Sequence, residues 1–416
     1  MKSKKQYDLA IIGGGPGGMA AAVRAKELGI EKVLILERDS VLGGILPQCI
    51  HSGFGLDIFN KELTGPEYAQ IFIDKISKVG IDVFLNTMAL KIDSKKNIVI
   101  TNKENGINII KTKSVILALG CRERTRGAIN IPGSRPAGIY TAGLVQRMVN
   151  IEGYLPGKEI IILGSGDIGL IIARRLKLEG CNVKGVFELM PFSTGLKRNI
   201  VQCLNDYNTP LFLSHTVTNI FGNERIEGVE ISEVNKNFKA IPNTKRRITC
   251  DTLVLSVGLI PENELSKTAN ILLDEGSQGP IVDEYLETSI PGIFSCGNSL
   301  FVNDLVDDVT KDGYLAAESA ALFLDGGEKS NSTIEVKAGN NIAYVIPQRI
   351  TGTKDVTFRI RPKEPNTDAV IKIPEINFNK KVKFVNPGEL IFLKVSKGFF
   401  KKSSLKKLNS IEIGFL

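Results

Sequence analysis

Two segments of the chain repeat the same order of apolar and polar positions. Residues 8–37 and 159–188 align without a gap, and each contains an apolar strand, a glycine-rich turn, a helical pattern, a second apolar strand and a glutamate. The helical pattern ends at Gly29 in the first copy and at Gly180 in the second. Continuous apolar strands that alternate with helices are typical of a buried parallel sheet. The pattern therefore predicts two β-α-β units of an α/β fold.

The turn in each copy has the spacing GxGxxG and an acid 19 residues after its last glycine, Glu37 or Glu188. In such a turn the glycines allow a tight bend, a close approach of the backbone to a pyrophosphate, and close packing of helix on strand. The N-terminus of the helix offers N–H groups to the phosphates, and the glutamate accepts hydrogen bonds from ribose hydroxyls. The two turns therefore predict two dinucleotide sites.

Other parts of the chain add strands to these units. Residues 114–120 and 252–258 are apolar strands that end in Gly120 and Gly258. A further strand at residues 291–298 leads through a short loop into a helix expected over about 308–324. From residue 334 onward, short β-like runs are broken by Pro and Gly, which predicts a small C-terminal β-rich domain.

The composition limits the chemistry that the chain can carry. The 416 residues are 43% hydrophobic and 24% charged, and no apolar run approaches the roughly 18 residues of a membrane span. We therefore expect a cytoplasmic enzyme without a membrane span. Six cysteines form no CxxC pair and only two histidines are present, which argues against zinc, iron–sulfur and disulfide frameworks. Redox chemistry would have to come from a bound cofactor.

The net charge of +8 is concentrated at the C-terminal end. Residues 331–416 contain 16 Lys and Arg against 7 Asp and Glu, a net charge of +9. Such a basic segment suits nucleic acid, a membrane surface or an acidic protein partner, or it is only a solvated lysine-rich face. We expect an acidic protein surface and no nucleic acid.

These motifs together resemble the flavoprotein family with two dinucleotide-binding domains that includes glutathione reductase and thioredoxin reductase. GGGPGG with Glu37 resembles its FAD site, GSGDIG with Glu188 resembles its NAD(P) site, and TSIPGIFSCGN resembles its second FAD segment. In that segment the family normally has an acid where this chain has Asn298. The resemblance implies an NAD domain inserted in an FAD domain: residues 1–150 and 276–330 bind FAD, 151–275 bind NAD(P), and 331–416 form the β-rich domain.

A narrower resemblance covers nearly the whole chain. The stretches LGGILPQCIHSGFG, LALGCRERTRGAI, GIYTAGLVQRMVN and SVGLIPENEL are similar to flavoprotein subunits found with glycerol-3-phosphate dehydrogenases, opine oxidases and hydrogen cyanide synthase. Such subunits work beside a second flavoprotein that oxidises the organic substrate. Some of them carry a cysteine-rich iron–sulfur segment, which this chain lacks.

The stretch LGGILPQCIHSGFG contains the two catalytic candidates, Cys49 and His51. In the disulfide reductases of this family, cysteines occupy the positions that are Leu46 and His51 here, so the usual dithiol is missing. Gly43–Gly44 should still place the segment against the flavin ring. His51 is then a candidate proton donor or acceptor, or only a packing residue. Cys49 is either a buried small hydrophobe or a nucleophile.

The sequence thus predicts an FAD-dependent oxidoreductase that exchanges hydride with NAD(H), prefers NADH and passes electrons to or from a partner dehydrogenase subunit or a small-molecule donor or acceptor. A stand-alone NADH oxidase and a nucleotide-holding scaffold are the alternatives, and the oligomeric state stays open. No metal site is expected. The expected cofactor-binding residues are Gly13, Gly15, Pro16, Gly17, Gly18, Glu37, Arg38, Gly43, Gly44, Gly120, Gly164, Gly166, Asp167, Ile168, Gly169, Glu188, Gly258, Gly297 and Asn298.

Overall fold

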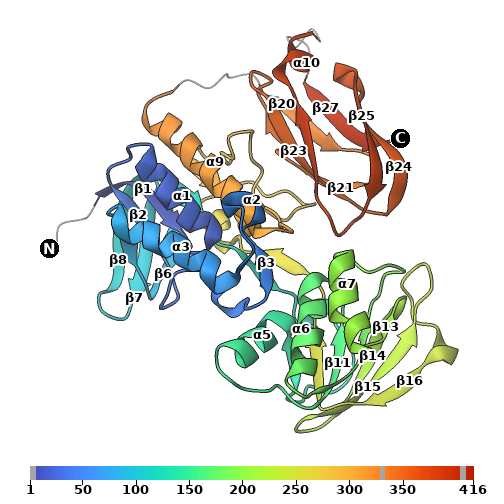
Figure 1. Ribbon diagram of the computed structural model, residues 1–416. Helices are drawn as coiled ribbons and strands as arrows, with labels where there is room; N and C mark the ends of the chain where they lie inside the picture. Colours follow the sequence, from blue (N-terminus) through green and yellow to red (C-terminus); the bar gives the residue numbers. More distant parts are fainter. Residues whose placement is uncertain (1–5, 328–332, 403–408) are drawn as a thin grey trace. The chain divides into compact units, whose positions relative to one another are not determined.

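The computed structural model describes residues 6–327, 333–402 and 409–416 (Figure 1). Contacts divide the chain into two compact units, Met1–Cys121 with Pro261–Leu416, and Arg122–Ile260. The short strands β9 (Cys121–Glu123) and β18 (Leu259–Pro261) pair where the chain passes from one unit to the other. The expected boundaries at residues 150 and 275 differ from these crossing points, and the assignment of a cofactor to each domain stays a prediction.

The first unit begins with a seven-stranded sheet in the order β5-β2-β1-β8-β7-β6, with β19 also paired to β8. Strands β5, β2, β1, β8 and β19 are parallel, and the β6-β7 hairpin is antiparallel. The strands are β1 (Gln6–Ile12), β2 (Val33–Leu36), β5 (Asp82–Phe84), β6 (Thr87–Ile92), β7 (Asn97–Asn102), β8 (Gly106–Leu117) and β19 (Ile293–Ser295), and the short pair is β3 (Ser52–Phe54) with β4 (Leu63–Thr64). The helices are α1 (Pro16–Glu27), α2 (Leu56–Phe59), α3 (Gly65–Lys78), α8 (Glu264–Thr268) and α9 (Val306–Leu324).

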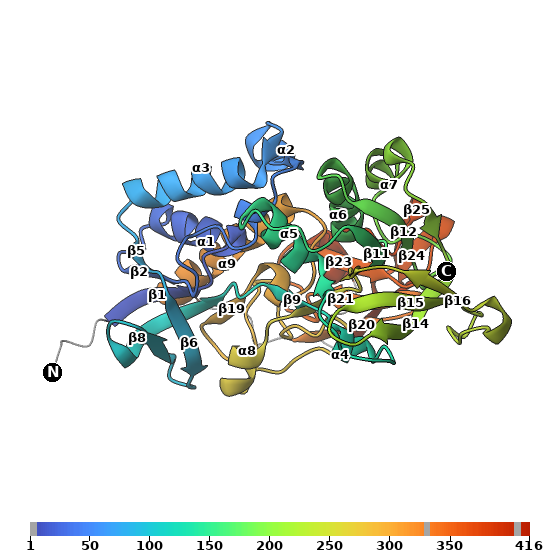
Figure 2. The same cartoon turned by 90° about the horizontal axis from the view of Figure 1, so that it is seen from below.

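The two faces of this sheet bury different sets of side chains because successive residues of a strand point to opposite faces. Leu9, Ile11 and Ile35 pack with residues of α1, α3 and α9 in one core cluster. Ala10, Ile12 and Leu34 pack in another with residues of the β6-β7 hairpin. Helices α1 and α3 lie on the same side of β1 (Figure 2). The prediction that β1 is a strand buried on both faces is thus confirmed.

The second unit contains a five-stranded parallel sheet in the order β10-β17-β11-β12-β13 and a three-stranded antiparallel sheet, β14-β15-β16. The helices α5 and α6 share a core with one face of the parallel sheet, and β14 and β15 share a core with the other. The strands are β10 (Ile139–Thr141), β11 (Glu159–Leu163), β12 (Asn182–Phe187), β13 (Leu211–Phe212), β14 (His215–Gly222), β15 (Ile226–Glu233), β16 (Arg246–Thr249) and β17 (Thr252–Leu255). The helices are α4 (Arg126–Ile129), α5 (Ala142–Asn150), α6 (Asp167–Leu178) and α7 (Lys197–Cys203).

The C-terminal part of the first unit is β-rich, as its broken apolar runs predict. Two sheets, β22-β20-β27-β24-β25 and β21-β23-β26, enclose one apolar core. The strands are β20 (Ile334–Ala338), β21 (Ile342–Ile346), β22 (Arg349–Ile350), β23 (Val356–Pro362), β24 (Asn366–Ile373), β25 (Phe378–Val385), β26 (Ile391–Val395) and β27 (Ser410–Phe415), with the short helix α10 (Lys397–Lys402). The mixed α/β fold with a C-terminal β-rich region is confirmed.

Candidate dinucleotide sites

The first glycine turn connects β1 to α1, and its backbone conformation and packing require glycine. Gly13 has a φ of +108°, and a Cβ there would lie 2.2 Å from the carbonyl oxygen of Ala118, so only glycine fits. A Cβ on Gly18 would lie 1.9 Å from the oxygen of Gly13, which means that helix and strand pack closely. A Cβ on Gly15 would have no neighbour nearer than 3.9 Å. The turn is therefore open where the helix begins.

The N-terminus of α1 is suited to an anion. Gly15 is the N-cap and supplies no side-chain cap, Pro16 is the first helical residue, and the first turn contains no acid. The first N–H groups of a helix have no partner within the helix, and they carry partial positive charge. The expected positions from Gly13 to Gly18 thus form one continuous turn at the helix start, as a phosphate-binding turn would.

Glu37 closes this turn from the end of β2. Its side chain is 6% exposed, and its two carboxylate oxygens accept hydrogen bonds from the N–H groups of Gly14 at 2.6 Å and Asp39 at 2.8 Å. A carboxylate has about four acceptor sites, so ribose hydroxyls can still be bound. Arg38 points to a more exposed surface, since its residue is exposed and Glu37 is buried.

The second turn repeats the two backbone hydrogen bonds of the first. Glu188 accepts hydrogen bonds from the N–H of Ser165 at 2.8 Å and of Met190 at 2.9 Å, as Glu37 does from Gly14 and Asp39. Gly164 has a φ of +99°, and a Cβ there would lie 1.9 Å from the oxygen of Ser256. A Cβ on Gly166 would meet nothing closer than 3.8 Å. The repeat read from the sequence is thus also a repeat of hydrogen bonds.

The second turn differs from the first at three polar side chains. The Ser165 hydroxyl donates to Glu188 at 2.6 Å. Asp167 occupies the place of Pro16, and its Oδ1 accepts hydrogen bonds from the N–H of Leu196 and the amide of Asn199 at 2.9 and 2.6 Å. These bonds tie the start of α6 to the start of α7. Sequence reasoning missed Ser165 and Asn199, although the alignment of Ser165 with Gly14 was a visible signal. Ile168 is half-buried in the first turn of α6.

The segment after Glu37 returns to the first turn. The N–H of Gly43 donates to the oxygen of Gly14 at 2.9 Å, and a Cβ on Gly44 would lie 3.0 Å from the Cα of Gly15. The residues that follow form a short 3-10 helix, Leu46–Gln48, and then β3. The structure thus brings Gly43–Gly44 against the turn predicted to hold FAD.

The catalytic candidates Cys49 and His51 occupy different surroundings. Cys49 is 9% exposed, its thiol contacts the oxygen of Ile45 at 3.4 Å, and burial raises its pKa to about 12. At neutral pH this thiol is protonated, which makes it a poor nucleophile. His51 is half-buried, with Nδ1 3.1 Å from the oxygen of Ser52 and its ring 5.0 Å from that of Phe54. All six cysteines are free.

The second segment expected to bind FAD packs against the first turn. A Cβ on Gly17 would lie 3.2 Å from the Val309 side chain of α9, and one on Gly297 would lie 3.0 Å from it, so the two glycines allow a close approach of this helix. The Asn298 side chain accepts a hydrogen bond from the N–H of Asn303 at 3.0 Å. Its amide contacts the Cys121 sulfur at 3.5 Å. Residues 17, 297 and 298 therefore lie in one region of the first unit.

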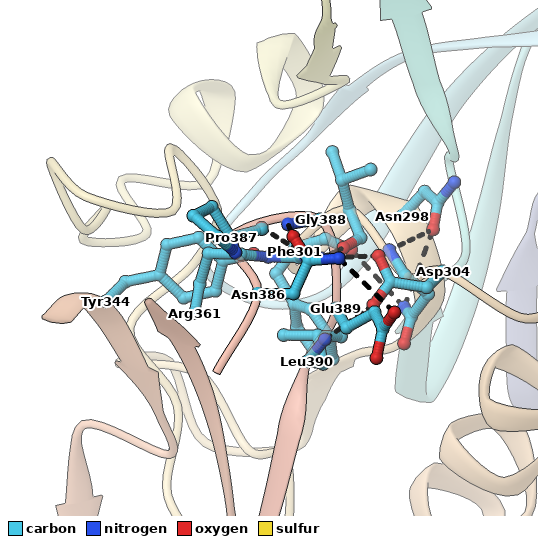
Figure 3. A network of polar contacts seen from close by, with 12 residues as sticks. Asn298, Phe301, Asp304, Tyr344, Arg361, Asn386, Pro387, Gly388, Glu389 and Leu390 are labelled. Atoms are coloured by element: carbon cyan, nitrogen blue, oxygen red, sulfur yellow. Dashed lines mark hydrogen bonds and ion pairs between the residues drawn. The ribbon is translucent and has the colours of Figure 1, made fainter. Parts of the chain in front are cut away.

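The loop after Asn298 is held by residues of the C-terminal β-rich region (Figure 3). Arg361 of β23 donates to the carboxylate of Asp304 at 2.7 Å and to the oxygen of Val302 at 3.1 Å. The other oxygen of Asp304 accepts from the N–H of Leu390 at 2.7 Å. Burial by itself would lower the pKa of Arg361, but Tyr344 and Asp304 raise it. Sequence reasoning missed this network because its members are distant along the chain.

The helix α9 begins at Val306 and carries Asp307 and Asp308 in its first turn. The positive end of a helix would stabilise negative charge on a reduced flavin that lay near it. The two acids offset that effect, although Asp308 pairs with Lys311 at 3.0 Å. Asp307 is buried, and its Oδ2 accepts from the N–H of Asp57 at 2.9 Å. The negative charges of Asp307 and Asp308 therefore reduce any stabilisation of a reduced flavin by this end of the helix.

The glycines that end the other two predicted strands lie where the chain passes between units. The oxygen of Gly120 accepts from the N–H of Glu262, and that of Gly258 accepts from the N–H of Arg124, each at 3.0 Å.

In the part of the chain that the structure describes, no cluster of three or more His, Cys, Asp and Glu side chains could hold a metal. Within the same residues, no helix is long and apolar enough to cross a membrane.

A model of the pyridine nucleotide-disulphide oxidoreductases matches residues 7–321, which span both glycine turns and the Asn298 segment. The chain belongs to this family. Its members are enzymes that typically bind FAD and NAD(P)H. The open turns at Gly15 and Gly166, the uncapped helix N-terminus at Gly15 and the paired glutamates fit two such nucleotides.

Among curated proteins, the chain is 24% identical over 311 residues to hydrogen cyanide synthase subunit HcnB of Pseudomonas protegens, covering 69% of this chain and 65% of that protein. It is 25% identical over 300 residues to an NADH dehydrogenase of Bacillus subtilis, covering 71% and 54%. The matched region thus spans about half to two thirds of these relatives.

Thioredoxin reductase structures from T. acidophilum and Lactococcus lactis match the fold of this chain. Their TM-scores are 0.61 and 0.62, at 24% and 22% identity, and they cover 76% and 77% of this chain and 98% and 99% of those chains.

Proposed function

We propose that this chain exchanges a hydride between NAD(H) and bound FAD, and that it passes electrons to or from a partner flavoprotein dehydrogenase subunit. The observation that carries the first half is the repeated bonding of Glu37 and Glu188 to their glycine turns. One chain with two such turns is suited to two nucleotides. Flavin supplies the chemistry of accepting a hydride from nicotinamide and releasing the electrons again.

The residues of this chain then bind, orient and hold protons. The turn Gly13–Gly18 would bind the pyrophosphate of FAD, Glu37 its ribose, and the stretch Gly43–His51 would lie near its ring. The turn Gly164–Gly169 and Glu188 would hold NAD(H). His51 would hold or release a proton at its imidazole, whereas Cys49 stays a buried protonated thiol. Because Leu46 and His51 occupy the dithiol positions, disulfide reduction by the usual route is not proposed.

A partner subunit is supported by two observations of different kinds. The relative HcnB is named as a subunit of hydrogen cyanide synthase, and the matched region covers 65% of it. The chain itself has a lysine-rich edge strand, β25, whose residues Lys380, Lys381 and Lys383 are all exposed. We propose that the partner is a substrate-oxidising dehydrogenase of the glycerol-3-phosphate, opine or hydrogen cyanide synthase type, which docks an acidic surface here.

Anaerobic mixing of the purified protein with NADH tests the redox proposal. We expect a yellow protein that releases FAD on denaturation and whose flavin absorbance bleaches rapidly with NADH. A colourless protein that cannot be reconstituted with FAD would refute the proposal. Bleaching that fails in a protein that retains FAD would favour the scaffold. Rapid reoxidation by air without any partner would favour the stand-alone NADH oxidase.

A further inference from the structure

The second unit contains a cavity of about 620 Å³ that none of the glycine-turn residues lines. Its walls come from residues 125–144, which form α4, the following loop, β10 and the start of α5, and from Leu255 at the end of β17. Small-molecule sites usually have volumes of roughly 300–1,000 Å³. The cavity is therefore large enough for a metabolite, and the two predicted nucleotide turns do not account for it.

Two arginines line this cavity, Arg126 and Arg135. Within the described residues, neither forms an ion pair with a carboxylate. The Nη2 of Arg126 donates to the oxygens of Ile131 and Gly133, each at 2.9 Å, which fixes the guanidinium in the loop. Its Nε is buried and has no hydrogen-bond partner. Because Nη2 is already bonded and Nε is enclosed by protein, the group that Arg126 has left for a ligand is Nη1.

The electrostatics of the two arginines point the same way. Burial and the nearby charge of Arg135 lower the pKa of Arg126. The cavity thus holds two positive charges that repel each other and that no acid of the described chain neutralises by an ion pair. An anion bound between them would offset this repulsion and would accept hydrogen bonds from the guanidinium groups.

The remaining walls indicate what the rest of the ligand is like. Thr125, Tyr140 and Thr141 offer hydroxyl groups, and Ile131, Leu144 and Leu255 offer apolar surface. A ligand with a short carbon body as well as an anionic group would use both kinds of wall. A phosphate monoester carries a charge of about −1.5 to −2 at neutral pH, which matches two guanidinium groups better than one carboxylate does.

We propose that this cavity binds a small organic phosphate, with Arg126 and Arg135 holding the phosphate group. Arg126 would position the phosphate from its fixed place in the loop, and Arg135, which is exposed, would complete the contact. The phosphate could belong to a free phosphate ester or to a nucleotide. This inference does not depend on the flavin chemistry proposed above.

Titration calorimetry of the full chain with phenyl phosphate, at constant ionic strength, tests the site. We expect Arg135→Gln to weaken binding about tenfold or more, because one charged hydrogen-bonding partner is lost. Arg247→Gln is the matched control, because this exposed arginine of β16 carries the same charge and does not line the cavity. Undetectable binding, or equal weakening by both variants, would overturn the proposal.

Two further measurements separate the sources of the phosphate and protect against misfolding. Gly166→Val should block the open side of the second turn, where a Cβ has no neighbour nearer than 3.8 Å. If NADH displaces phenyl phosphate equally from this variant and from the wild type, a nucleotide phosphate occupies the cavity. If NADH does not displace it from either, the ligand is a free ester. Arg126→Lys is compared with the wild type for thermal stability as well as for phenyl phosphate binding. Both are measured because Arg126 also donates hydrogen bonds to the loop, so its replacement affects folding as well as the ligand.

Discussion

The thiol of Cys49 lies two residues from the imidazole of His51, yet the protein gives the two groups unlike surroundings. Cys49 is enclosed and its pKa is raised to about 12, whereas His51 is half-buried beside Phe54. An imidazole can give or take a proton during turnover, but a thiol that stays protonated cannot act as a thiolate. The two side chains therefore lead to opposite expectations for chemical labelling and for catalysis.

We expect iodoacetamide to leave Cys49 unlabelled in the native protein at about pH 7 and to label it readily after unfolding. Since burial raises the pKa of this thiol, the reactive thiolate forms only as the pH rises toward about 12. Peptide mass spectrometry of native and denatured samples measures the difference. Equal labelling of both samples near pH 7 would show that the thiol is open and ionisable.

We expect His51→Ala to retain FAD but to slow flavin reduction by NADH, and to remove a pH dependence near neutrality. General acid–base assistance is typically worth about 10²–10⁴-fold, well above the few-fold change expected from repacking. Stopped-flow absorbance measures the rate, with Cys49→Ser as the control that should change it little. A His51→Ala rate within a few-fold of the wild type would make His51 a packing residue. An inactive Cys49→Ser enzyme would assign the chemistry to the thiol.

At the scale of elements, the two strand–turn–helix units share the same pattern of hydrogen bonds. Each glutamate binds two backbone N–H groups through both of its oxygens. A glutamine at either position could satisfy only one of these donors and would turn its own NH₂ toward the other. Glu37→Gln and Glu188→Gln make the same change in the two units, so each variant is the control for the other.

We expect Glu37→Gln to weaken FAD retention while NADH binding survives, and Glu188→Gln to do the reverse, each by about tenfold. Glu188→Gln should also narrow the preference for NADH over NADPH, because a carboxylate repels a 2′-phosphate at a cost of several kcal/mol. Flavin content after dialysis and the binding constants of both nucleotides are the measurements. Loss of FAD from both variants alike would show that the halves are not independent.

The units that the sequence predicts best are those in which local rules and the fold agree. The glycine turns and the acids at strand ends follow from spacing alone, and so does the burial of continuous apolar strands. Arg361 could not be predicted in this way, since charged residues are usually exposed and its partner Asp304 lies 57 positions away. Long-range polar pairs depend on tertiary packing, and no periodicity in a single sequence reports them.

We expect Asp304→Asn to loosen the segment that follows Asn298 without abolishing folding. The carboxylate joins Arg361 to the N–H of Leu390, and an amide would keep one of these contacts but lose the charge. If this segment borders the flavin, the variant should change the flavin absorption spectrum and speed FAD release. Glu364→Gln, an exposed acid of the same domain, is the control. An unchanged flavin spectrum and FAD release rate would show that the bonds of Asp304 to Arg361 and Leu390 only hold the C-terminal β-rich region in place.

At the scale of the whole chain, the C-terminal β-rich region is part of the first compact unit rather than an attached tail. Arg359 and Arg361 lie two positions apart on β23, and they pair with Asp312 of α9 and with Asp304. Removing one partner of a buried ion pair costs about 3–5 kcal/mol. Deleting the domain would leave both acids unpaired, so a deletion cannot separate partner binding from folding. Substitutions on its surface can.

We expect the triple variant Lys380→Glu, Lys381→Glu and Lys383→Glu to weaken association with the partner subunit and to reduce the dependence of that association on salt. These side chains lie on β25, an edge strand next to the exposed Phe384, and they contribute to the net charge of +9 over residues 331–416. Contacts between exposed charges weaken as ionic strength rises because salt screens them.

The control for this variant is Lys91→Glu, Lys103→Glu and Lys111→Glu, three exposed lysines of the first unit outside the C-terminal region. Both triple variants change the net charge equally, so they separate a local docking surface from the overall field of the protein. Co-purified partner is captured with each variant over a series of salt concentrations. Lysines on an edge strand also prevent strands from pairing between molecules. If both triple variants bind the partner alike and only the β25 variant aggregates, the lysines protect the edge and the partner binds elsewhere.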